Sequence, residues 1–305
     1  MQGDAGRLPA KPLSYALITP ARNEARTLAR TIESVVNQTV VPLRYIVVSD
    51  GSTDATDDIV KSASQQYEWI QLVRLPERQV RHFAGKVHAF NAGLVHLEHL
   101  QFDVLGSLDA DITFGPDYFE FLLTKFAENA SLGVAGTPFR EGDFQYDFRF
   151  SSTDHVSGAC QLFRRKCFED IGGYLPIKEG GIDLVAVVSA RMKGWQTRTF
   201  TEKFCLHHRR TQSGQQASLS QTFRSGYHDY LMGSHPVWQV FRSMYQLRRR
   251  PIFIGGLLLL TGYMWALVKH PKRPIGDEFV RFRRNEQLRR LRGFISLPLV
   301  RRRTI

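Results

Sequence analysis

The sequence YIVVSDGSTDAT, residues 45–56, joins a run of apolar residues to a polar loop that contains glycine. Apolar residues at helical spacing follow it, so this stretch predicts a strand, a loop and a helix in succession. The same succession occurs upstream, where YALIT at residues 15–19 leads through the loop PARNEA into a helical pattern over residues 25–37. Further strands are predicted at 70–73 and 102–108, and a further helix at about 86–97. This alternation indicates an α/β fold with a mainly parallel sheet flanked by helices.

The chain continues to about residue 208 without a linker or a change in composition. Its second half predicts strands at 134–139, 156–163 and 196–200, and an apolar-faced helix at 181–193. We therefore expect three parts: a flexible N-terminus at residues 1–13, one domain at residues 14–215, and a helical C-terminal region at residues 216–305.

Polar loops follow three of the predicted strands, with the sequences PARNEA, SDGSTDAT and LDAD. Parallel sheets bind ligands at the carboxyl ends of their strands, where such loops lead into the next element. No GxGxxG follows the first strand and no GxxxxGK[ST] occurs in the chain. The sequence therefore excludes the dinucleotide-binding fingerprint and the P-loop as explanations of these loops.

The formal net charge of +12 is concentrated at the C-terminal end of the chain. Residues 240–305 contain 16 Lys and Arg against 3 acids, whereas the first 239 residues contain 25 against 26. Because the excess lies on both sides of one long apolar run, it favours an anionic membrane surface as the partner of this region. No nucleic acid partner is expected, since the region has no recognisable reader motif.

That apolar run, PIFIGGLLLLTGYMWALV at residues 251–268, contains no charged residue. At 1.5 Å per residue its 18 residues would extend roughly 27 Å, close to the thickness of the hydrocarbon layer of a bilayer, so it predicts either a single span or a helix in the interface. Residues 277–295 set apolar side chains among arginines, as in a basic amphipathic helix. The alternative for this region is a buried helix with a solvated basic face.

Only three cysteines are present, Cys160, Cys167 and Cys205, and none belongs to a CxxC pair. An odd and sparse set excludes a disulfide framework and gives no zinc-ligand spacing, which favours a reducing, cytoplasmic compartment. Residues 1–11 are polar, so no signal peptide is predicted there.

Carboxylates are the candidate chemical groups of the loops. Asp109 and Asp111 alternate about a small residue at the end of a strand, so both can face one Mg²⁺ or Mn²⁺ ion, with phosphate oxygens and water as further ligands. A solvated loop is the alternative. Asp54 is explained by capping of the following helix. Asp50 either accepts hydrogen bonds from a base or ribose hydroxyl, or is a turn residue.

Five motifs occur in order along the chain: TPARNEA, VVSDGSTDAT, AGKVHAFNAG, SLDADI and GIDLVAVVSARMKGW. Together they resemble the family-2 glycosyltransferases over about Tyr15 to Tyr230. The resemblance implies a GT-A fold that binds a nucleotide-sugar, and transfer of the sugar with inversion at the anomeric carbon, generally with a divalent metal.

By position, the resemblance implies a set of residues that bind the nucleotide-sugar, of which three line the nucleoside pocket, one neutralises phosphate charge and one faces the ribose or sugar. These are Pro20, Glu24 and Asp50 in the pocket, Lys86 at the phosphates and Asp109 at the sugar. The resemblance places Asp111 at the metal, which Asp109 can also ligate. In the segment LHHRR it places His207, in preference to His208, against the metal and diphosphate. Asp183 matches the general base, which takes the proton of the acceptor hydroxyl.

Two positions depart from the family pattern. The family often has Glu before the base, whereas this chain has Ile182, so the handling of the acceptor differs. The segment Gln221–Arg224 resembles the QxxRW signature of polymerising members, but Ser225 replaces the Trp. This substitution favours transfer of a single sugar over processive polymerisation.

The sequence thus predicts a metal-dependent, inverting glycosyltransferase with a nucleotide-sugar donor, Mg²⁺ or Mn²⁺, and a lipid-linked or envelope polysaccharide acceptor. We expect it at the cytoplasmic face of the inner membrane, as a peripheral or single-span protein. Two alternatives remain: a nucleotidyltransferase acting on a sugar phosphate, and a non-catalytic protein that binds membranes or nucleic acid.

Overall fold

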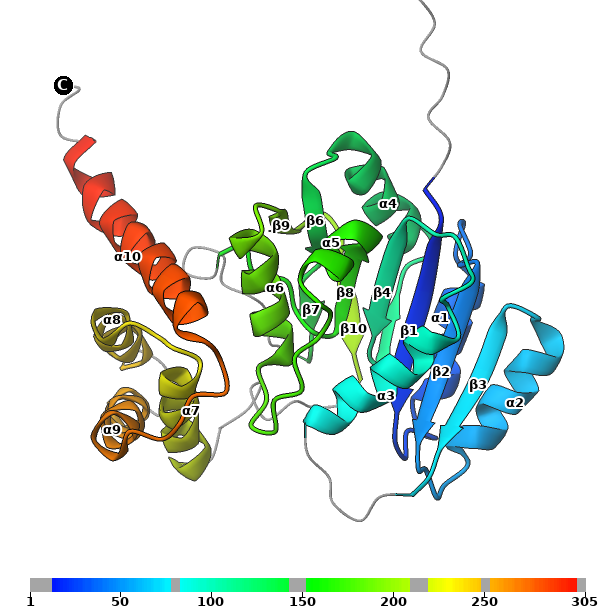
Figure 1. Cartoon of the computed structure of the whole chain (residues 1–305), viewed down its shortest axis with the longest axis horizontal. Coiled ribbons are helices and arrows are strands. Elements are labelled where there is room, and N and C mark those ends of the chain that lie inside the picture. The colour runs from blue at the N-terminus through cyan, green and yellow to red at the C-terminus, as the bar shows by residue number, and fades with distance from the viewer. Residues whose placement is uncertain (1–12, 78–82, 143–151, 209–218, 248–252, 301–305) are drawn as a thin grey trace, which may run out of the picture. The chain divides into compact units, whose positions relative to one another are not determined.

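A computed structural model describes residues 13–77, 83–142, 152–208, 219–247 and 253–300, with side chains as far as residue 294 (Figure 1). The flexible N-terminus predicted at residues 1–13 therefore lies almost entirely outside the described residues. The chain divides into two compact units, Met1–Arg209 and Arg210–Ile305.

The first unit is built on a seven-stranded sheet with the strand order β3-β2-β1-β4-β8-β6-β9. All neighbouring strands are parallel except at β8, which runs antiparallel to β4 and to β6. The strands are β1 (Tyr15–Ala21), β2 (Arg44–Asp50), β3 (Ile70–Leu75), β4 (Val104–Leu108), β6 (Leu132–Gly136), β8 (Cys160–Arg164) and β9 (Gln196–Thr199). The prediction of a mainly parallel sheet is confirmed.

Helices cover both faces of this sheet, because its inner strands are apolar on both sides (Figure 1). On one face Leu17 and Val47 belong to a cluster with α1 (Leu28–Val36), α2 (Thr56–Gln66) and α4 (Tyr118–Glu128). On the other, α3 (Ala84–Val95) lies close to the strands, since Gly93 faces the side chains of Ile18 and Val48. The remaining helices of the unit are α5 (Arg165–Asp170) and α6 (Ile182–Met192).

A second, three-stranded sheet has the order β5-β10-β7. Its strands are β5 (Ile112–Phe114), β7 (Phe139–Arg140) and β10 (Cys205–His207). Because β5 begins directly after the LDAD loop, this sheet brings residues from the end of the domain back to the carboxyl end of β4.

The predicted strand at 156–163 is wrong in its first half, because the strand begins only at Cys160. The Ser157 hydroxyl accepts a hydrogen bond from the Ala159 amide, and the Gln161 side chain donates to the Val156 carbonyl. These local side-chain hydrogen bonds replace the bonds of a strand ladder and hold the backbone in a turn.

The three cysteines are buried and unpaired by disulfides. Burial raises the pKa of the Cys167 and Cys205 thiols to about 12, so both thiols stay protonated at neutral pH. The absence of a disulfide among the three agrees with the prediction that they form no disulfide framework.

The second unit is helical, as predicted, and consists of α7 (Leu219–Leu231), α8 (Pro236–Gln246), α9 (Ile254–Lys269) and α10 (Asp277–Val300). Helices α7 and α9 approach each other at glycines: a Cβ on Gly226 would lie 2.0 Å from the Leu259 carbonyl oxygen, and one on Gly262 would lie 2.0 Å from that of Phe223. Only glycine fits where two backbones come this close.

Helix α10 attaches to the turn after α7. The Arg283 guanidinium donates to the Met232 carbonyl, that of Arg284 donates to the Gly233 carbonyl at 3.4 Å, and Gln287 accepts from the His235 amide at 2.7 Å. Cationic side chains suit these carbonyls, which follow a helix C-terminus. Two arginines of the basic region therefore have a structural role.

None of the helices in the described residues combines the length and the apolar character that crossing a membrane requires.

Candidate active site

The LDAD loop holds its two carboxylates at the carboxyl end of β4. The Asp109 amide donates to the Ala159 carbonyl at 2.9 Å, and the Ala110 carbonyl accepts from the Thr31 hydroxyl at 3.0 Å. Ala110 is buried in the core cluster. These contacts fix the backbone on both sides of the loop, so the carboxylates of Asp109 and Asp111 have defined positions.

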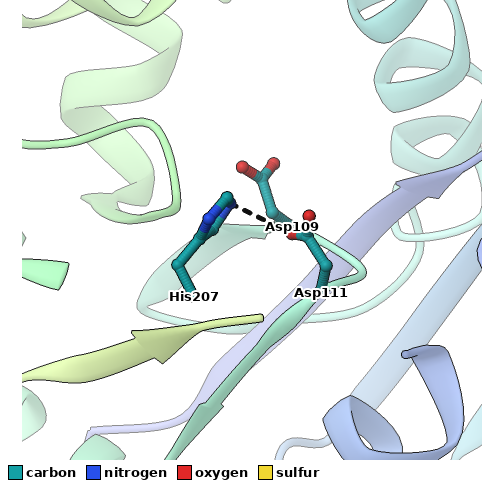
Figure 2. Close-up of side chains that lie close together, drawn as sticks. All are labelled: Asp109, Asp111 and His207. Carbon is teal, nitrogen blue, oxygen red and sulfur yellow. Dashed lines mark ion pairs between the residues drawn. The ribbon is translucent and has the colours of Figure 1, made fainter. Parts of the chain in front are cut away.

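Strand pairing in the second sheet brings His207 to this loop. Strand β10 runs antiparallel to β5 with His207 opposite Ile112, and the His208 amide donates to the Asp111 carbonyl at 2.8 Å. The His207 Nε2 atom then lies 3.4 Å from Asp111 Oδ1 (Figure 2). One potential ligand atom from each of Asp109, Asp111 and His207 lies within 4.8 Å of the others.

Two carboxylates and one imidazole form a donor set that suits a divalent cation such as Mg²⁺ or Mn²⁺. Among the described residues this is the one group of three or more acidic, His or Cys side chains so arranged. Asp111 and His207 are nearly buried, and Asp109 is more exposed, so the set has a closed side and an accessible side. The residues present therefore fit the metal that the sequence predicts.

Glu141 is a residue of this site that the sequence analysis did not identify. Its Oε2 atom lies 3.5 Å from His207 Nδ1, and both side chains are almost fully buried. A carboxylate at the second nitrogen of a metal-binding histidine orients the ring and favours the tautomer that leaves Nε2 free to ligate. No spacing rule predicts this contact, since Glu141 follows β7, which pairs with β10 only in the folded chain.

Lys86 lies at the start of α3 and forms an ion pair with Asp109. Its Nζ atom also lies 3.4 Å from the Gly158 carbonyl oxygen. Burial is the largest influence on the Lys86 pKa and lowers it, but the charge and hydrogen bond of Asp109, together with the charges of Asp183 and Asp111, outweigh burial and raise the pKa. Lys86 therefore stays protonated, and its ammonium belongs to the same charge cluster as three aspartates.

Asp183 lies in the first turn of α6, after Gly181, whose φ of 82° is left-handed. A carboxylate in the first turn interacts favourably with the helix dipole, which is the structural alternative to a catalytic role for Asp183. The Asp183 side chain packs against Gly158: a Cβ at that position would lie 3.1 Å from Asp183 Cβ and 3.2 Å from Oδ2. Because Lys86 contacts the Gly158 carbonyl and Asp109, this places Asp183 beside the cluster.

The other three predicted residues lie at the ends of β1 and β2. Pro20 pairs in register with Val48, and Asp50 is the last residue of β2 and nearly buried. The Glu24 amide donates to the Thr56 hydroxyl at 2.9 Å. Since β1 lies between β2 and β4 and is parallel to both, these residues share the sheet edge of the LDAD loop.

Hydrogen bonds join the two loops PARNEA and SDGSTDAT and give other residues of these motifs a structural role. Asn23 accepts from the Thr53 amide at 2.8 Å, and its own amide donates to the Ser52 hydroxyl at 3.1 Å. Asp54 accepts from the Thr56 amide at 3.0 Å and from the Ala25 amide at 3.1 Å. It lies one residue before Ala55, the N-cap of α2. PARNEA and SDGSTDAT therefore form one joined structure at the sheet edge.

Comparison with known proteins gives a match over residues 16–172 to the model of the family described as "Glycosyl transferase family 2". Among curated proteins, the chain is 26% identical over 122 residues to a chondroitin synthase of Pasteurella multocida, covering 40% of this chain and 12% of that protein. It is 29% identical over 134 residues to a 4,4'-diaponeurosporenoate glycosyltransferase of Staphylococcus aureus, covering 42% of this chain and 33% of that protein. The matched segments thus span a third or less of these relatives.

Two solved structures share the fold. A mannosyltransferase from Pyrobaculum calidifontis, PcManGT, in complex with GDP-Man and Mn²⁺, has a TM-score of 0.55 and 18% identity, covering 98% of this chain and 84% of that one. Residues 1–349 of TarS from S. aureus, in complex with UDP-GlcNAc, have a TM-score of 0.53 and 14% identity, covering 83% of this chain and 72% of that one.

Proposed function

The chain belongs to glycosyl transferase family 2, and from this premise we propose that it transfers a single sugar from a nucleotide-diphosphate donor, with a divalent metal and with inversion at the anomeric carbon. The observation that most supports this proposal is the cluster of Asp109, Asp111, His207 and Lys86, with Asp183 beside it. The PcManGT and TarS complexes with nucleotide-sugars, the former also with Mn²⁺, give the donor and metal further support.

The donor would bind at the edge formed by β1, β2 and β4. Pro20, Glu24 and Asp50 would line the nucleoside pocket, and Asp109 would face the ribose or sugar. Asp109, Asp111 and His207 would hold Mg²⁺ or Mn²⁺, which when bound supplies positive charge beside the departing diphosphate. The protonated Lys86 adds a fixed positive charge at the same place, which stabilises the negative charge that develops on the leaving group.

Asp183 would remove the proton of the acceptor hydroxyl as the new bond forms. Inversion needs a carboxylate on the side of the sugar opposite the leaving group, and one base suffices when the leaving group is already stabilised. The charge of Asp183 raises the Lys86 pKa, as those of Asp109 and Asp111 do, which supports a position of its carboxylate beside the donor phosphates.

The acceptor proposal rests on the C-terminal region. Residues 240–305 contain 16 basic against 3 acidic residues, which supports association with an anionic membrane and hence a lipid-linked or envelope polysaccharide acceptor. We propose a location at the cytoplasmic face of the inner membrane. Ser225, in place of the Trp of polymerising members, supports transfer of one sugar at a time.

The test is product analysis. Incubation of a panel of UDP-, GDP- and TDP-sugars with Mn²⁺ and lipid-linked or polysaccharide acceptors is expected to release the nucleoside diphosphate. NMR of the glycoside formed is expected to show an inverted anomeric configuration. Release of pyrophosphate from a nucleoside triphosphate and a sugar phosphate would instead identify a nucleotidyltransferase. Absence of any nucleotide binding in calorimetry, with and without Mn²⁺, would favour the non-catalytic alternative. Family membership favours the first outcome.

Glu141→Gln is expected to weaken Mn²⁺ binding about 10- to 100-fold, because the neutral amide no longer orients His207 by charge. Mn²⁺ titration followed by electron paramagnetic resonance, without donor, measures this. Glu128→Gln is the control, because Glu128 is exposed and pairs with Lys125; this variant is expected to bind Mn²⁺ with wild-type affinity. Equal Mn²⁺ affinity in wild type and Glu141→Gln would show that Glu141 does not support the site.

Gly158→Ala is expected to lower kcat roughly tenfold while KM for the donor stays unchanged, because the added methyl displaces the Asp183 carboxylate by a few tenths of an ångström. Gly276→Ala is the matched control, since nothing lies within 4 Å of its Cβ position and its φ is not left-handed. Steady-state kinetics with a common donor separates the two constants. A rise in KM with unchanged kcat would place the effect on the donor instead.

A further inference from the structure

Helix α9 in the second unit has an exposed face that contains no charge until its last residue. The exposed positions recur at helical spacing, and Leu257, Trp265 and Val268 are 61%, 52% and 70% exposed. The full set on this face is Ile254, Leu257, Thr261, Met264, Trp265 and Val268. The opposite face, which includes Gly262 and Tyr263, packs within the unit. A surface helix of a soluble unit ordinarily exposes polar residues on the side opposite its buried face, whereas α9 is apolar on both sides.

Helix α8 buries polar residues and exposes apolar ones. Its buried residues are the polar Gln239 and Ser243, whereas Val237, Val240 and Met244 are about half exposed or more. These three follow one another at intervals of three and four, so they lie on one side of the helix. Helices α8 and α9 are neighbours, since Gly256 of α9 faces Ser243 and Leu247 at the end of α8. The two helices thus expose apolar faces within one small unit.

Cationic side chains accompany these faces. Lys269 lies at the end of the exposed α9 face with its ammonium 5.0 Å from the centre of the Trp265 ring. On α10 the exposed arginines Arg281, Arg289 and Arg292 recur at intervals of eight and three, which places them along one side of that helix. In contrast, the apolar residues Phe279 and Leu291 of α10 are buried. Helix α10 therefore offers charge rather than apolar surface.

We infer that the second unit binds an anionic lipid surface by inserting the exposed faces of α8 and α9 into the headgroup region, with α10 contributing charge and not apolar contact. This rests on the membrane association of the proposed function and names the surface responsible. It agrees with the interfacial helix that the sequence allows at residues 251–268. It differs from the amphipathic membrane helix expected at residues 277–295, because Phe279 and Leu291 of that segment are buried.

A lipid surface is the occupant that fits these faces. A protein partner would need to match a broad apolar surface flanked only by positive charge, whereas anionic lipid offers acyl chains and negative headgroups together. A tryptophan beside a lysine at the end of the helix is typical of the interfacial layer, where the ring and the ammonium stay near the headgroups while aliphatic side chains lie deeper.

The experiment uses the full chain and vesicles of phosphatidylcholine with and without phosphatidylglycerol, scored by cosedimentation. Wild type is expected to bind the anionic vesicles, and Leu257→Glu combined with Trp265→Glu to weaken this binding at least tenfold, because two side chains lose their apolar contact. Arg281→Ala and Arg289→Ala are expected to weaken it by about fivefold each and to reduce its salt dependence. Val95→Glu, an equally exposed apolar position in the first unit, is the matched control with wild-type binding.

Insertion is measured separately by quenching with brominated lipid. Trp265 fluorescence is expected to be quenched, and Trp265→Phe is expected to remove a large part of the quenched signal. Strong binding without quenching, or a double variant that binds as wild type does, would overturn the assigned surface while membrane association stands. No binding by wild type would overturn both. Dimerisation that the double variant abolishes, with no vesicle binding, would identify a second copy as the occupant. Nucleotide-sugar turnover without vesicles tests the catalytic proposal independently.

Discussion

Asp111→Asn is expected to abolish sugar transfer, with kcat reduced at least about a hundredfold. The asparagine has nearly the same shape, but it removes the negative charge that lies 3.4 Å from His207 Nε2 in the most enclosed part of the cluster. A divalent cation held by Asp109 and His207 alone would lose one of its two carboxylate ligands. Calorimetry is therefore expected to show weaker Mn²⁺-dependent binding of the nucleoside diphosphate, together with the loss of turnover.

Asp117→Asn is the matched control for this variant. Asp117 lies in the connection after β5, is about half exposed and pairs with Lys203 at 2.5 Å, so its loss removes a carboxylate near the site without touching the cluster. Circular dichroism and thermal unfolding check that both variants remain folded. Wild-type turnover in a folded Asp111→Asn protein would show that the cluster holds no catalytically required metal, and the proposed metal dependence would be wrong.

The fold was predictable because its signals are local. Each strand of the first half is an apolar run that ends in a polar loop, and the following helix shows its own spacing, so β1, β2 and β3 and the helices after them follow from short windows of sequence. Strands β5 and β10 were not predicted, and β7 was not separated from β6, because each has only two or three residues and takes its conformation from pairing with distant strands.

The candidate site likewise contains residues that the sequence predicts and contacts that only the folded chain creates. Asp109, Asp111 and Asp183 stand at ends of elements, where the sequence indicates chemistry, and the structure brings them together with Lys86. The contact of Glu141 with His207 depends on the packing of β7 and β10, for which no window of sequence contains the information. The apolar run of α9 was visible in the sequence, but the exposed face of α8 was not, because an apolar spacing shows which residues share a side of a helix and not which side is covered.

Asp183→Asn is expected to reduce kcat by about 10² to 10⁴, the usual contribution of a general base, while binding of donor and Mn²⁺ stays close to that of wild type. This contrast with Asp111→Asn follows from position. Asp183, on α6, contacts Gly158 and is not one of the three residues whose ligand atoms lie together, so its amide variant leaves the metal set intact. The loss then belongs to the proton transfer step rather than to donor binding.

Two further variants sharpen this test. Asp183→Glu keeps a carboxylate but moves it by about one methylene, so partial activity is expected, whereas a residue needed only for charge balance would tolerate the change fully. Asp58→Asn removes a highly exposed carboxylate on α2 and is the control with unchanged kinetics. Turnover of Asp183→Asn that falls only because KM for the donor rises would assign Asp183 to donor binding. The acceptor proton would then need another base, and the inverting mechanism proposed for this chain would lose its central residue.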